Sequence, residues 1–144
     1  MGVTCVDQRI AGLFSVESYG GVPHASTLGG SCIPMAVAAR MLEIVEREGL
    51  VDRARILGDH AMTELRDRSA RLPIRDVRGR GLFIGLELDD TYSRTATDVV
   101  REALHRGVLL GAAGDRVLRI APPLIVSEDE LEGGIKLIAD ILAS

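Results

Sequence analysis

The sequence has a single lysine, Lys136, although 17 of its 144 residues are lysine or arginine. Any chemistry that needs a lysine amine at a defined position therefore has only this residue to use. Cysteine is scarce as well. Cys5 and Cys32 lie far apart, without the paired spacing of a disulfide framework, which is typical of a protein in a reducing compartment.

Long apolar runs and clusters of one charge are also absent. No run reaches the length of a membrane-spanning helix, and no charged segment followed by an apolar one marks a secretory start. Val6 stands where an N-terminal acylation signal needs Ser or Thr. The formal net charge of −4 and the scattered arginines argue against a nucleic-acid partner. We expect a soluble, cytoplasmic chain with no membrane and no nucleic-acid partner.

Enough apolar residues are present to build a core, since they make up 47% of the chain. Their spacing predicts a short helix over 7–14 and longer helices over about 34–48, 51–72 and 96–106. A capping box at Ser127–Glu130 predicts the start of a last helix. The expected apolar stripes are Met35, Ala38, Leu42 and Val45; Ala54, Leu57, Ala61 and Leu65; and Leu131, Ile135, Ile138 and Leu142.

Between these helices the apolar period changes to two. It predicts strands over 74–78, 82–88, 108–110 and 116–121, with a turn at 111–115, and residues 1–5 resemble the end of another strand. Residues 15–23 form a glycine-rich loop in this interpretation. The predicted fold class is α+β, a small and mainly antiparallel sheet with helices covering one face.

One stretch suited to binding an anion is His24–Ser31. Gly29 and Gly30 precede a helix start, where uncovered backbone N–H groups and the helix dipole favour an anion, and Thr27 adds a hydroxyl. The alternative is a Gly-Gly turn followed by Ser31 as the N-cap.

A second candidate is Arg119, a lone cation in the otherwise apolar stretch Val117–Pro123. A guanidinium there can hold a carboxylate with two parallel hydrogen bonds. The alternative is an arginine that merely points outward from an amphipathic strand.

Other motifs do not support a site. Gly79, Gly81 and Gly85 have the wrong spacing for a dinucleotide loop and precede a strand, so we interpret them as structural glycines in a β connection. The three histidines are far apart, so we expect no metal site. The carboxylates of Glu87–Asp90 are interpreted as a solvated turn rather than an acid–base pair.

Four stretches taken together resemble the C-terminal part of class III pyridoxal-phosphate-dependent aminotransferases, the family of the ornithine, acetylornithine and 4-aminobutyrate enzymes. They are residues 24–30 (HASTLGG), 77–88 (VRGRGLFIGLEL), 107–110 (GVLL) and 118–131 (LRIAPPLIVSEDEL). The resemblance spans nearly the whole chain. It implies the C-terminal small domain of a fold-type I transferase over 31–144, with 1–30 a connecting segment from the large domain.

The resemblance also implies roles for individual residues. Thr27, with Ser26 and Gly29, would contact the phosphate of pyridoxal 5'-phosphate bound in the neighbouring subunit, and Arg119 would hold the substrate carboxylate. Leu28 stands where the family usually has an aromatic residue. The imine-forming lysine of the family belongs to the large domain and would fall shortly before Met1, so we expect no catalytic residue in this chain.

The resemblance therefore implies part of an enzyme that transfers an amino group from an amino acid to a 2-oxo acid. Such a part needs a large domain, in the same chain or separately encoded, and we expect a homo-oligomer such as a dimer. Because Lys136 falls in the last predicted helix, we expect the chain alone to be inactive and its binding of the cofactor to be weak or absent. The alternative is a binding or interaction module that kept the small-domain fold without catalysis.

Overall fold

The structure is a computed structural model that describes residues 6–21 and 29–144. The chain divides into two compact units, residues 1–47 and 48–144, each described by itself below. The predicted strand end at residues 1–5 lies outside the described residues. The predicted boundary at 30/31 concerns the domains of a complete enzyme, and it stays a prediction.

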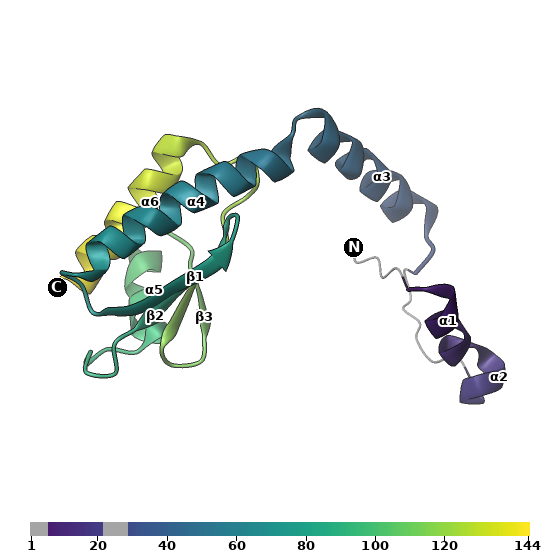
Figure 1. The fold of residues 1–144 in the computed structure, drawn as a ribbon, viewed down its shortest axis with the longest axis horizontal. Coiled ribbons are helices and arrows are strands. Elements are labelled where there is room, and N and C mark those ends of the chain that lie inside the picture. The colour runs from purple at the N-terminus through teal and green to yellow at the C-terminus, as the bar shows by residue number, and fades with distance from the viewer. Residues whose placement is uncertain (1–5, 22–28) are drawn as a thin grey trace. The chain divides into compact units, whose positions relative to one another are not determined.

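The second unit holds a four-stranded sheet and three helices (Figure 1). In chain order these are α4 (Leu50–Ser69), β1 (Ile74–Arg80), β2 (Phe83–Leu88), α5 (Ala96–His105), β3 (Gly111–Ala113), β4 (Val117–Ile120) and α6 (Glu128–Leu142). The strand order is β1-β2-β4-β3, and every neighbouring pair is antiparallel. The predicted α+β class with a small antiparallel sheet is confirmed.

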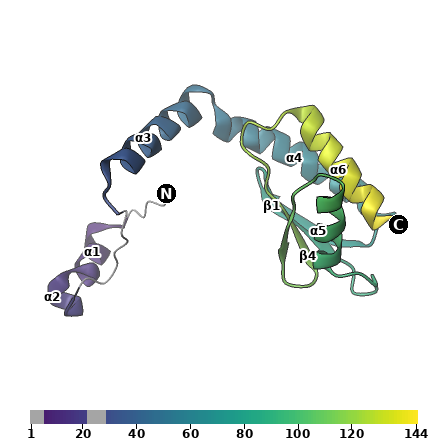
Figure 2. The ribbon, with the colours of Figure 1, turned by 180° about the vertical axis from the view of Figure 1, so that it is seen from behind.

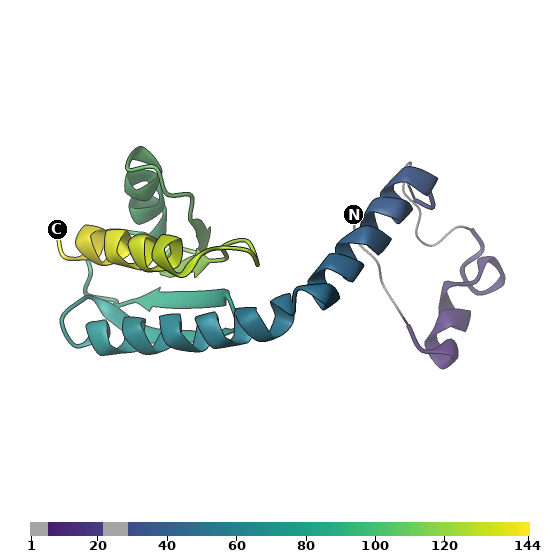
Figure 3. The ribbon, with the colours of Figure 1, turned by 90° about the horizontal axis from the view of Figure 1, so that it is seen from above.

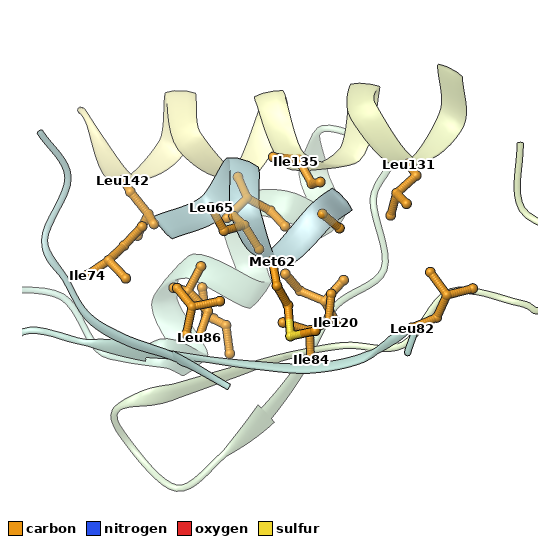
Figure 4. Close-up of a cluster of buried hydrophobic side chains, with 14 of the residues drawn as sticks. Met62, Leu65, Ile74, Leu82, Ile84, Leu86, Ile120, Leu131, Ile135 and Leu142 are labelled. Atoms are coloured by element: carbon orange, nitrogen blue, oxygen red, sulfur yellow. The ribbon is translucent and has the colours of Figure 1, made fainter. Parts of the chain in front are cut away.

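The three helices share one face of this sheet. Helices α4 and α6 lie side by side (Figures 1 and 3), and α5 packs against α6, β3 and β4 (Figure 2). Between them lies the core, in which Met62 of α4 lies near Ile84 of β2 and Ile120 of β4 (Figure 4). The predicted stripes on α4 and α6 are all buried. The opposite face of the sheet carries Arg78, Gly85 and Arg119, together with the exposed apolar side chain of Phe83.

Two capping boxes fix the starts of α5 and α6. At α6 the Ser127 hydroxyl accepts from the Glu130 N–H, and the Glu130 carboxylate accepts from the Ser127 N–H at 2.8 Å. Thr95 and Asp98 make the same exchange at α5. These hydrogen bonds satisfy N–H groups that a helix start leaves without partners. The box predicted at Ser127 is confirmed.

One predicted strand is wrong. Residues 108–110 form no strand, and the edge strand is β3, inside the predicted turn. Helix α5 ends at His105, Gly107 follows it at a φ of +86°, and residues 108–110 connect it to β3. Gly114, at a φ of +66°, then turns the chain between Ala113 and Val117, which sets the register of β3 on β4.

The first unit contains α1 (Gln8–Ala11), the 3₁₀ helix η1 (Gly12–Phe14), α2 (Val16–Tyr19) and α3 (Cys32–Arg47). The single helix predicted over 7–14 is therefore two short ones, and part of the predicted loop 15–23 is helical. The hydroxyl of Ser15 accepts from the Ser18 N–H and starts α2, and Gly20, at a φ of +72°, ends it. Helix α3 confirms the prediction for 34–48.

Apolar side chains of the first unit stay exposed. None of its residues whose burial the structure describes is buried, and Ile33, Phe14 and Leu42 are 77%, 53% and 66% exposed. Of the stripe predicted on α3, Met35 and Leu42 are exposed, and Ala38 and Val45 are half-buried. Exposed apolar patches of this kind are typical of surfaces that bind a partner.

Candidate carboxylate and phosphate sites

Arg119 lies on the open face of the sheet. It is exposed in β4, while Leu118 and Ile120 on either side of it are buried, so its side chain is on the face opposite the helices. The alternation that makes β4 a half-buried strand therefore decides where the guanidinium is. An exposed Arg119 between buried neighbours fits both the predicted ligand role and the alternative of an outward-facing arginine on an amphipathic strand, so the ligand role stays a prediction.

Glycines flank Arg119 on both neighbouring strands. Gly85 of β2 and Gly111 of β3 are its register partners, and Arg78 of β1 is the partner of Gly85. A Cβ atom added to Gly111 would lie 2.9 Å from Nε and 3.0 Å from Nη2 of Arg119. The guanidinium therefore lies over the backbone of the edge strand β3.

Arg119 makes no ion pair and no side-chain hydrogen bond with any described residue. Most arginines of the second unit are used structurally. Arg116 donates to the carbonyls of Asp89, Asp90, Tyr92 and Arg94, and Arg53 donates to those of Leu124 and Val126. The Arg119 guanidinium has five N–H donors. Because none of them has a side-chain partner among the described residues, they can donate to a carboxylate from outside the chain.

Most of the neighbouring charged side chains on β1 and β2 are already paired, and Arg80 of β1 is an exception among the described residues. Arg78 donates to Asp76 and to Glu87, and these two carboxylates raise the pKa of the Arg78 guanidinium. Arg75 pairs with Asp90 at 2.9 Å. Asp89 accepts from the hydroxyl and the N–H of Thr91, which lowers the pKa of its carboxyl. Asp89 thus lies in a turn, as predicted, whereas Glu87 is in strand β2, and both Glu87 and Asp90 form ion pairs that the sequence did not predict.

The predicted phosphate contacts Ser26 and Thr27 lie outside the described residues. Gly29 and Gly30 form a turn just before α3, with Gly30 at a φ of +74°. Ser31 follows, and its carbonyl oxygen accepts from the Met35 N–H at 3.2 Å. The described part of the loop therefore has a left-handed glycine followed by a helix start. Both the anion-binding interpretation and the alternative of a simple Gly-Gly turn predict these features.

Neither a metal site nor an amine nucleophile is found in the part of the chain that the structure describes. No group of His, Cys, Asp and Glu side chains there could hold a metal ion. Lys136 is exposed on α6, next to the buried Ile135, as a solvated surface side chain is. Among the described residues no helix is both long and apolar enough to span a bilayer.

The family described as Aminotransferase class-III matches residues 1–142. The chain belongs to the class III aminotransferases. It is 36% identical to the ornithine aminotransferase of Halalkalibacterium halodurans over 99% of its length, and 41% identical to the acetylornithine aminotransferase of Thermosynechococcus vestitus over 83%. The structure superposes on that of the Toxoplasma gondii ornithine aminotransferase with a TM-score of 0.73 and 33% identity, over 83% of this chain.

The matched region is only a part of those proteins. This chain covers 33% and 30% of the two relatives and 29% of the Toxoplasma gondii chain. Class III aminotransferases depend on pyridoxal 5'-phosphate, the cofactor at the active site of the Toxoplasma gondii enzyme. The family predicted from the four sequence stretches and the antiparallel sheet predicted from the apolar periodicity are both confirmed.

The structure also places Gly111 next to Arg119, a proximity that the sequence did not indicate. With a strand predicted at 108–110, Gly111 fell in a turn, and no motif marked it. Only the register of β3 on β4 shows that it is the cross-strand neighbour of Arg119.

Proposed function

We propose that this chain forms the C-terminal part of a pyridoxal-phosphate-dependent aminotransferase that moves an amino group from an ornithine-, acetylornithine- or 4-aminobutyrate-like amino acid to a 2-oxo acid. The main support is the guanidinium of Arg119, exposed on the open sheet face and without a partner among the described residues. Both substrates of a transaminase carry a carboxylate, so one carboxylate-binding arginine serves both half-reactions.

In this proposal Arg119 binds and orients the substrate. Two parallel N–H donors to the two carboxylate oxygens fix the substrate's rotation as well as its position. Ser26, Thr27 and Gly29 contact the cofactor phosphate of the neighbouring subunit in this proposal. The helix dipole and the free N–H groups at the start of α3 favour the phosphate charge.

Pyridoxal phosphate supplies the electron sink that makes the amino acid's Cα–H acidic. Among the described residues before α3, the left-handed Gly30 and the helix start fit its phosphate. Lys136 does not fit the amine that would attach it, because it lies exposed on α6. We therefore propose that the chain alone does not transaminate and that the lysine comes from a large domain.

The proposed partner is that large domain, together with a second subunit. Curated relatives are about three times as long as the matched segment, so the surfaces that cover the exposed apolar residues of α1, η1 and α3 would come from the unmatched two thirds. The cytoplasm remains the expected location.

A chimera tests the function. The matched segment of the Halalkalibacterium halodurans ornithine aminotransferase is replaced by this chain, and turnover of ornithine with 2-oxoglutarate is measured. We expect an active enzyme in which Arg119→Lys raises KM about tenfold, the loss of one hydrogen bond to a charged group. Arg71→Lys is the matched control, because the Arg71 side chain also has no partner among the described residues but follows α4.

The result also separates the alternative. A folded chimera that binds pyridoxal phosphate but does not turn over would favour the non-catalytic module. An active chimera with equal KM values for Arg119→Lys and Arg71→Lys would remove Arg119 from the substrate site.

A further inference from the structure

Gly111 and Arg119 share a row of cross-strand neighbours on the open face of the sheet. The row runs Arg78, Gly85, Arg119, Gly111 across β1, β2, β4 and β3. Of the two glycines beside Arg119, only Gly111 has the guanidinium where its side chain would be. A Cβ added to Gly111 would lie 2.9 Å from Nε and 3.0 Å from Nη2 of Arg119.

We propose that Gly111 is a positioning residue of the carboxylate site. Its missing side chain lets the Arg119 guanidinium lie over the edge strand, with its donors free for a carboxylate at that edge. The inference rests on the proposed role of Arg119. It adds that Gly111 determines the direction in which the Arg119 side chain points.

The backbone does not explain the glycine. The φ of Gly111 is outside the left-handed region, so an alanine could adopt the same conformation. The three nearest atoms to an added Cβ all belong to the Arg119 side chain, and none is backbone. The far end of an arginine can move, so Gly111→Ala should redirect the guanidinium without unfolding the sheet.

Gly85 provides the matched control. An added Cβ at Gly85 would lie 3.6 Å from Cγ1 of Val117 and 3.8 Å from the carbonyl oxygen of Arg78, which are ordinary contacts. Gly85→Ala therefore adds the same methyl group in the same row, on the other side of Arg119, without reaching the guanidinium.

The experiment uses the 144-residue chain with its arginine side-chain N–H groups observed by NMR. Sodium acetate is the carboxylate probe at constant ionic strength, and acetamide is the uncharged probe of the same shape. The wild-type chain should show a contact between the Arg119 Nε–H and the Gly111 Hα. Acetate, unlike acetamide, should shift the Arg119 Nε–H more than those of Arg71 and Arg80, which also have no partner among the described residues.

Gly111→Ala should weaken acetate binding at Arg119 about tenfold, because a guanidinium that points in another direction loses one of its two charged hydrogen bonds to the carboxylate. Gly85→Ala should leave it unchanged, and the melting temperature of both variants should stay at that of the wild type. A purely structural role for Gly111 would move the melting temperature instead.

The two failures differ. If acetate shifts Arg119 no more than Arg71 and Arg80 in the wild-type chain, the carboxylate role fails, and the inference with it. If acetate binds and Gly111→Ala binds it as well as Gly85→Ala does, only the positioning role fails. Loss of folding in Gly111→Ala would also contradict the inference, which requires unchanged stability.

Discussion

A Cβ atom added to Gly58 of α4 would lie 2.1 Å from the carbonyl oxygen of Gly81, in the turn between β1 and β2. The helix therefore touches the hairpin backbone directly at this point. Gly81 itself has a φ of +56°, and an added Cβ on Gly79 would lie 2.4 Å from the carbonyl oxygen of Phe83. The glycines at 79 and 81 thus allow close backbone packing in the connection between β1 and β2, which agrees with their interpretation as structural glycines.

Gly58→Ala should destabilise the second unit by about 3 kcal/mol, because the backbone contact with Gly81 must open to admit the methyl group. Urea unfolding measures the loss. Gly133→Ala is the control. That glycine is also inside a helix, nothing lies within 4 Å of its added Cβ, and the change should stabilise by roughly 0.5–1 kcal/mol. If Gly58→Ala and Gly133→Ala changed the free energy of unfolding equally, the close contact between Gly58 and the Gly81 backbone would be contradicted.

Arg116→Met should destabilise the chain by about 1–3 kcal/mol, because several carbonyls of the loop after β2 lose a charged donor. The nearest of these bonds joins Nη1 to the Tyr92 carbonyl at 2.8 Å. Hydrogen exchange should rise at residues 89–95. Arg119→Met should change neither measurement, because Arg119 has no partner among the described residues. A destabilising Arg119→Met would reveal a structural role.

The capping box at α6 should make stability depend on acid pH. The Ser127 N–H, and after it the Ser127 hydroxyl, donate to Glu130 and lower the pKa of its carboxyl below the ordinary 4.5. Because the folded pKa is the lower one, the stabilisation is complete above about pH 4.5 and is lost as the pH falls through the folded value. Glu130→Gln should remove part of this acid dependence and leave the slope above pH 6 unchanged. An unaltered acid transition would contradict the prediction.

The isolated chain should self-associate through the apolar residues of the first unit. Sedimentation velocity of the wild-type chain should show species larger than a monomer, and replacing the exposed Met35 and Leu42 of α3 by glutamate should reduce them. Ile56→Glu, a change at an exposed apolar residue of α4, is the control and should have a smaller effect. A compact wild-type monomer would contradict the prediction.

Local signals placed most of the fold. Helix α4 and helix α6 follow from apolar residues at helical spacing, and the Ser127 box marks the start of α6, because capping depends on residues three apart in the chain. The strands β1, β2 and β4 follow from alternation. Short elements were less predictable. The 108–110 stretch is apolar enough for a strand, yet only Val108 and Leu110 pack against the core, Leu109 is exposed, and the small residues of β3 form the sheet edge.

The amino-acid sequence by itself determined the family, the α+β class and the two candidate groups, since these depend on residue types and their order. It placed Arg119 in a strand with buried neighbours, which fixes the face on which it lies. Only the tertiary structure decided that this cation lacks a partner among the described residues and that its guanidinium lies over Gly111. The reason is that strand register brings together residues eight positions apart in the chain, and no local pattern encodes that pairing.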